Sequence, residues 1–226
     1  MNNNHSLKNY NEKHKSDHWQ FQINRKKGLF KTKNLYNFRN NNLSFGLDDQ
    51  FYSKKQFLNN FDLLKKVCGN KFLEKTLLKK NIGNVKNFIK FKGKYFVDMH
   101  EIFFVKYLFD LEKNIDFKKI EYICDIGSGY GGLVSKILKL YNTKKIILID
   151  LPESNFVSSF YLKKIFPKKK FFFSSKLNNG KFQKKDLEKY DIFIMSPWDS
   201  FPFKKIDLFI NTRSMMEMDY QVINKY

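Results

Sequence analysis

The chain has 226 residues, 42% of them hydrophobic, which is enough for one domain of ordinary size with its own core, with or without an appendage. Its formal charge is +21, but the excess is spread along the whole chain and most aromatic residues are Phe within apolar runs. We therefore favour a compositional bias and expect no stable nucleic-acid partner. The sequence shows no apolar run of membrane-spanning length, no signal-peptide core and no disulfide or metal spacing at its two cysteines, Cys68 and Cys124, which predicts a cytoplasmic protein without a metal site.

Residues 1–45 are rich in Asn and Lys, and their few apolar residues are scattered. A segment of this composition buries little apolar surface, so we expect it to be partly disordered or loosely docked. Three of the four histidines, His5, His14 and His18, fall in this segment and are expected to be solvated.

Residues 46–118 are predicted to form a helical lead-in, or cap, to the rest of the chain. Apolar residues recur at helical spacing over 48–82, and a second helix is predicted for about 98–113. Asp98 is the expected N-cap of that second helix, because Glu101 follows three residues later as in a capping box.

The pattern changes from residue 119 onward, where short apolar runs alternate with helical spacing. The segment "EYICDIG" reads as a buried strand, "GGLVSKILKLY" as a helix and "KKIILIDLPE" as a second buried strand, followed by a helix over 154–166. Strand, helix and strand within about thirty residues form a βαβ unit, so the predicted fold is α/β with a parallel, Rossmann-like sheet. "YDIFIMSPWD", "IDLFINT" and, more weakly, "KKKFFFSS" are further strand candidates. Their order stays open, because about ten residues between the first two is short for a parallel crossover.

The first strand ends in a glycine-rich turn that has the spacing of a nucleotide site. Gly127, Gly129 and Gly132 fit G-x-G-x-x-G, and the helix that follows offers free N–H groups to a ligand. Asp150 ends the second strand, where a carboxylate can accept both hydroxyl protons of a ribose. Asp125 discriminates between ligands, because its charge would repel a pyrophosphate and suits the ammonium and sulfonium of S-adenosylmethionine. We therefore favour S-adenosylmethionine over NAD, with an NAD-dependent sugar oxidoreductase as an alternative.

Three blocks together resemble one family. "ICDIGSGYGGL", "ILIDLPE" and "IDLFINTRSMMEM" are similar to the sugar O-methyltransferases of bacterial surface-polysaccharide clusters, which are class I, Rossmann-like enzymes. The resemblance covers about residues 120–226. The glycine block is generic to class I enzymes, whereas D-L-P-E and N-T-x-S-M-x-E-M are more specific.

The resemblance implies an S-adenosylmethionine-dependent O-methyltransferase that acts on a sugar or glycan. It also implies roles for individual residues: the methionine end of the cofactor is lined by Asp125, Gly127, Gly129 and Gly131, and the ribose is held by Asp150. Asp199 could meet the adenine amino group, although a solvated loop acid is an equal interpretation. A basic nucleic-acid-binding or nucleic-acid-modifying protein stays as an alternative function.

Methyl transfer to a hydroxyl needs a base, and the sequence offers two weak candidates. His100 is the one histidine within a helical pattern, and an exposed helix position is the favoured interpretation for it. Glu217 lies three residues after Ser214, which favours a helix cap over a base, with Met215, Met218 and Val222 forming a buried helical stripe. Arg213 is a candidate clamp for an acidic sugar.

The expected sheet stops after its fourth strand, whereas class I methyltransferases normally have seven. The sequence therefore predicts a sheet that is incomplete at the C-terminus. It also predicts that the strand near 207–211 pairs on one side only, which would limit activity of the chain alone.

Overall fold

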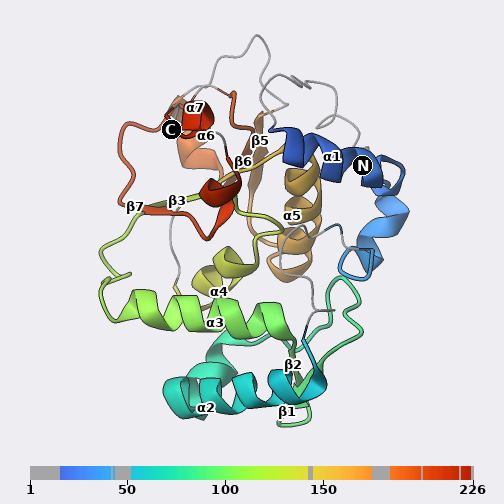
Figure 1. Cartoon of the computed structure of the whole chain (residues 1–226). Helices are drawn as coiled ribbons and strands as arrows, with labels where there is room; N and C mark the ends of the chain where they lie inside the picture. Colours follow the sequence, from blue (N-terminus) through green and yellow to red (C-terminus); the bar gives the residue numbers. More distant parts are fainter. Residues whose placement is uncertain are drawn as a thin grey trace.

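The computed structural model describes residues 16–41, 43, 52–141, 145–174, 184–199, 201–218 and 220–224 (Figure 1). The α-helices are α1 (Asp17–Lys26), α2 (Lys54–Thr76), α3 (Met99–Glu112), α4 (Gly132–Leu140), α5 (Pro152–Ile165), α6 (Lys184–Lys189) and α7 (Tyr220–Ile223). The strands are β1 (Ile89–Phe91), β2 (Tyr95–Val97), β3 (Tyr122–Ile126), β4 (Lys145–Ile149), β5 (Phe171–Phe173), β6 (Ile192–Met195) and β7 (Leu208–Ile210). Short 3₁₀ turns are η3 (Lys27–Leu29), η4 (Thr32–Asn37) and η8 (Ser214–Glu217).

A parallel five-stranded sheet with the order β5-β6-β4-β3-β7 forms the centre of the molecule. This confirms the predicted α/β, Rossmann-like fold. The central strands β3 and β4 are buried on both faces, which explains their continuous apolar sequences. β6 and β7 are not neighbours, because β4 and β3 lie between them. The short connection between them therefore crosses two strands, and the strand order that the sequence left open is settled.

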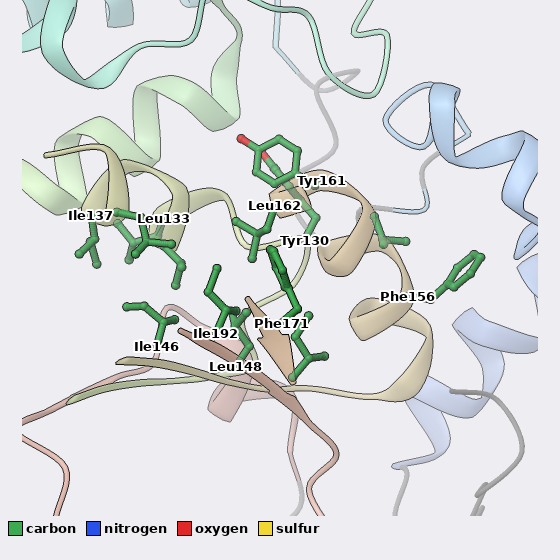
Figure 2. Packing of buried hydrophobic residues seen from close by; sticks show 14 of the residues in the cluster. Tyr130, Leu133, Ile137, Ile146, Leu148, Phe156, Tyr161, Leu162, Phe171 and Ile192 are labelled. Atoms are coloured by element: carbon green, nitrogen blue, oxygen red, sulfur yellow. The ribbon is translucent and has the colours of Figure 1, made fainter. Parts of the chain in front are cut away.

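Helices α4 and α5 cover one face of the sheet. Figure 2 shows Leu133 and Ile137 of α4 and Leu162 of α5 directed toward Ile146 and Leu148 of β4. These side chains belong to the largest cluster of buried apolar residues in the described chain. The apolar spacing predicted for "GGLVSKILKLY" thus corresponds to a helix packed on the sheet.

Among the described residues, the opposite face of the sheet is covered by connecting segments and by the six-residue helix α6. Phe203, from the segment that connects β6 to β7, packs edge-on against Phe193 of β6 at 5.0 Å between ring centroids. Met215 and Met218 also pack here and are half-buried. The sequence predicts one continuous helix from residue 214, but the structure has the 3₁₀ turn η8 followed by the four-residue α7, so that prediction is wrong. The side chain of Val222 lies outside the described set.

Helix α3 joins the sheet domain to a second cluster formed with α2 and the β1–β2 hairpin (Figure 1). It can approach α4 closely because Gly132 has no side chain: a Cβ there would lie 2.1 Å from Phe104 Cε2. The predicted N-cap is confirmed, since the Asp98 side chain accepts a hydrogen bond from Glu101 N at 3.1 Å. Within α2, Gly69 adopts a positive φ and kinks the helix, which continues to Thr76.

The N-terminal segment packs more tightly than its composition predicts. Leu35 and Phe38 have no exposed surface and belong to the same core cluster as α4 and α5. The expectation of loose docking is therefore wrong for residues 16–41. A few apolar residues are enough to dock a polar segment when each of them is buried in the core of the sheet domain. Residues 1–15, with His5 and His14, lie outside the described ranges, while His18 is exposed on α1.

None of the helices in the described part of the chain is long and apolar enough to cross a membrane.

Candidate active site

The glycine turn between β3 and α4 is held in a conformation that favours glycine. Gly127, Gly129 and Gly131 all have positive φ, at 69°, 56° and 82°. Gly127 N donates to the carbonyl of Ile149 at 2.7 Å, which ties the start of the turn to the end of β4. Gly131 is the N-cap of α4 in the left-handed region. The turn therefore lies at the carboxyl edge of the sheet, where parallel sheets bind ligands.

Asp150, at the end of β4, clamps this turn from the neighbouring strand. Its Oδ2 accepts from Gly129 N at 2.7 Å, and its Oδ1 accepts from Leu151 N at 2.7 Å. Burial raises the pKa of Asp150 to about 6, although the backbone donors act in the opposite direction. A carboxylate oxygen can accept more than one hydrogen bond, so Asp150 retains capacity for the hydroxyl of a ligand.

Asp125 is a buried acid at this edge of the sheet with unused hydrogen-bonding capacity. It is 1% exposed, and its Oδ1 has no hydrogen-bond partner among the residues that the structure describes. Burial, and then the nearby charge of Asp150, raise the pKa of Asp125 to about 8. The buried Oγ of Ser128 in the adjacent turn likewise has no partner in the described ranges. Buried acceptors and donors of this kind fit a bound ligand that carries both positive charge and polar groups.

Asp199 lies in a closed turn that follows β6. Its carboxylate accepts from Ser196 N, and its own backbone N–H donates to Ser196 O at 3.0 Å. β6 pairs with β4, and Asp150 N donates to Met195 O, so Asp199 and Asp150 follow adjacent strand ends. The local hydrogen bonds account for Asp199 as a turn residue, and its contact with adenine stays a prediction.

A buried polar cluster supports the glycine turn from the side of α3. The ring of His100 stacks on that of Tyr130, in the turn, with centroids 5.8 Å apart. Arg39 lies over the same Tyr130 ring at 5.2 Å and forms two 3.0 Å hydrogen bonds with Asp98. A second buried ion pair joins Glu101 to Lys136 of α4. These contacts link the N-terminal segment, α3 and α4 to the turn.

This arrangement corrects the prediction for His100 and reveals residues that the sequence analysis missed. His100 is 4% exposed and stacks on Tyr130, so the expectation of an exposed helix position is wrong, while its role as a base stays a prediction. Arg39 and Asp98 are 59 positions apart, and no local pattern pairs them. The large aromatic residue within a glycine turn, Tyr130, was the one signal that could have pointed to this cluster.

The expected capping box at Ser214 and Glu217 is also wrong. The N-cap position of η8 is Arg213, in the left-handed region, and no side chain caps the turn there. Ser214 Oγ instead donates to the carbonyl of Ile126 at 3.0 Å, and the side chain of Glu217 is exposed. The pattern S-x-x-E failed because the chain reverses at Arg213, so that Ser214 faces β3.

Comparison with known families identifies the domain that these elements form. Residues 87–198 match the family model of the O-methyltransferase domain. The chain carries an O-methyltransferase domain. It is a methyltransferase, and S-adenosylmethionine is its methyl donor. No curated protein matches the chain at a significant level.

The O-methyltransferase domain, as matched, runs from just before β1 to the turn after β6. It therefore contains α3, the glycine turn, Asp125 and Asp150, whereas Arg39 and the segment after β7 lie outside the match. The donor chemistry decides between the two ligands that the glycine spacing left open, in favour of S-adenosylmethionine. Within the described residues, no three His, Cys, Asp or Glu side chains gather as a metal site.

Proposed function

We propose that this methyltransferase transfers the methyl group of S-adenosylmethionine to a hydroxyl of a sugar, as part of a surface glycan. The buried and unpartnered carboxylate of Asp125, beside the glycine turn, is the observation that carries the cofactor half of the proposal. In the proposal, Asp125 faces the positive methionine end of S-adenosylmethionine and Asp150 accepts from its ribose, while Gly127, Gly129 and Gly131 let the backbone approach it.

The sugar half of the proposal is supported by the two blocks that resemble sugar O-methyltransferases. In the structure both blocks hold the glycine turn: "DLPE" through Asp150, and "NTRSMMEM" through Ser214. The candidate clamp Arg213 favours an acidic sugar as the acceptor. Arg213 is exposed next to the turn and is proposed to meet such a charge.

The cofactor half is tested by isothermal titration of the chain with S-adenosylmethionine and with NAD. We expect S-adenosylmethionine to bind and NAD not to bind. Asp150→Ala should weaken binding by roughly 1.5–3 kcal/mol, the usual loss for hydrogen bonds to a charged group. Asp125→Ala should also weaken binding, whereas in a dinucleotide site the loss of that charge should improve it. Tight binding of NAD alone would overturn the assignment.

The sugar half is tested by incubating the chain with labelled S-adenosylmethionine and a panel of neutral sugars, acidic sugars and nucleotide sugars, with mass-spectrometric detection of methylated products. The expected product is an O-methyl sugar. Methylation of RNA or DNA in a parallel reaction, together with binding that weakens steeply with salt, would favour the nucleic-acid alternative instead.

A further inference from the structure

We propose that Asn211 and Ser214 are positioning residues for the cofactor turn: their side chains extend the β3–β7 ladder by one step and fix Ile126 and Gly127 for binding of the donor. Both lie beyond the residues matched by the O-methyltransferase domain. The inference deepens the proposed function, because it assigns the segment after β7 a part in holding the methionine end of S-adenosylmethionine.

The carbonyl of Ile126 lies where the β3–β7 ladder ends. β3 pairs with β7 through Asp125 and Ile210, and β7 ends there. The carbonyl of Ile126 is therefore one step beyond the backbone donors of β7. In their place Asn211 Nδ2 donates to it at 2.8 Å and Ser214 Oγ donates at 3.0 Å. Both lone pairs of a buried carbonyl are thus satisfied by side chains.

The side-chain amide of Asn211 forms hydrogen bonds through both its nitrogen and its oxygen. One N–H of Nδ2 donates to Ile126 O, and Nδ2 also donates to Ser214 Oγ at 2.5 Å. Its Oδ1 accepts from Met215 N at 3.3 Å. A fully satisfied network of this kind specifies one geometry, because any single replacement leaves a buried group without its partner.

Ser214 also lies in close contact with Gly127. A Cβ built on Gly127 would lie 1.9 Å from Ser214 Oγ and 2.2 Å from Ser214 Cβ, so the turn and Ser214 meet where only glycine fits. Ser214 reaches this place because Arg213 holds φ at 83°, an unfavourable value for a residue with a side chain. A strained residue next to a ligand-binding turn is typical of a functional constraint.

The test measures affinity for two ligands, S-adenosylhomocysteine and 5′-methylthioadenosine, which lacks the amino-acid end. Asn211→Ala and Ser214→Ala should each lower the affinity for S-adenosylhomocysteine about 3- to 10-fold, the effect of roughly one hydrogen bond. Affinity for methylthioadenosine should change less than about 2-fold, because the proposed partner of its ribose is Asp150, at the end of β4. Thr212→Ala, at a half-buried position between the two residues, is the matched control and should change neither affinity.

A second measurement uses the close approach of Gly127 and Ser214. Gly127→Ala should lower the affinity for S-adenosylhomocysteine by about 100-fold or more. Adding Ser214→Gly removes the clashing atoms, and the nearest remaining atom of residue 214 is Cα at 3.7 Å. The double variant should therefore bind at least about tenfold better than Gly127→Ala alone, although Ser214→Gly by itself weakens binding.

The outcomes separate the inference from the proposed function. If the unmodified chain binds neither ligand, the proposed cofactor site fails. The inference is overturned if the unmodified chain binds both ligands and the Asn211 and Ser214 variants lower the two affinities equally. It is overturned too if these variants lower only the melting temperature, because the two residues are then merely structural. Additive losses in the Gly127→Ala, Ser214→Gly double variant would overturn it as well.

Discussion

At the scale of single residues, the ionised carboxylate of Asp125 lowers the stability of the ligand-free protein. It is buried beside Asp150, and its Oδ1 has no partner in the described structure, so its ionised form is disfavoured. A group that destabilises the fold without a ligand and suits the charge of that ligand is typical of a binding site. The sequence indicated Asp125 by its place in D-x-G-x-G, but its burial depends on packing that the sequence does not display.

Because the ionised form of Asp125 destabilises the fold, we expect the stability of the ligand-free chain to depend on pH. Its pKa in the folded chain is about 8, above the ordinary value for Asp, so the folded state binds the extra proton between about pH 4 and pH 8. Stability from this group is present at low pH and is lost as the pH rises toward 8. Asp125→Asn should therefore raise the free energy of unfolding at pH 8 by roughly 2–4 kcal/mol and change it little at pH 4.

Urea unfolding of the ligand-free chain at several pH values checks this expectation. Asp62→Asn, an exposed acid on α2, is the control and should change stability by less than about 0.5 kcal/mol at any pH. A gain from Asp125→Asn that is equal at pH 4 and pH 8 would contradict the titration argument and point to packing alone.

At the scale of elements, the same sequence pattern had two outcomes. D-x-x-E at Asp98 predicted a helix N-terminus correctly, whereas S-x-x-E at Ser214 did not. A capping pattern predicts a helix N-terminus only where no distant group competes for the capping side chain. Ser214 instead donates a hydrogen bond to the carbonyl of Ile126. Strands β3, β4 and β6 were predictable from their apolar runs. The hairpin β1–β2 was missed, because three-residue strands give too short a period to detect.

The buried ion pair of Asp98 and Arg39, at the N-terminus of α3, leads to a prediction for stability. Burial alone would raise the pKa of Asp98, but Arg39 beside it lowers the pKa below its ordinary value. Both side chains are 5% exposed, so removing Arg39 leaves a buried charge without its ion pair. Arg39→Met should therefore lower the free energy of unfolding by roughly 3–5 kcal/mol. Asn can still cap a helix, so Arg39→Met combined with Asp98→Asn should be more stable than Arg39→Met alone.

Chemical unfolding of both variants checks the pair, with Arg25→Met on α1 as the control. Arg25 is exposed, and its loss should cost little. If the double variant is less stable than Arg39→Met, the buried charge is not the source of the loss, and the contact of Arg39 with Tyr130 would account for it instead.

At the scale of the whole molecule, β7 is an edge strand of the sheet in the described part of the chain. Among the described strands β7 pairs with β3 alone, as the sequence predicted. Phe209 on β7 is 58% exposed, and exposed Met216 and Tyr220 follow it in the chain. An edge strand with apolar side chains can pair with another chain. The formal charge of +21 opposes such association, because two copies repel each other at low ionic strength.

These two effects predict association that increases with salt. Raising the salt concentration from about 0.05 M to 0.5 M shortens the screening length from roughly 14 to 4 Å, so repulsion fades while apolar contacts persist. Light scattering and sedimentation should then show growth of oligomers in the unmodified chain. Phe209→Lys places a charge on the edge and should suppress that growth, because a charged edge strand disfavours pairing. Phe21→Lys, at a residue that is 60% exposed and lies on helix α1 rather than on a strand, is the matched control. If both Lys variants suppress association equally, added charge alone explains the effect, and the edge of β7 has no special part in it.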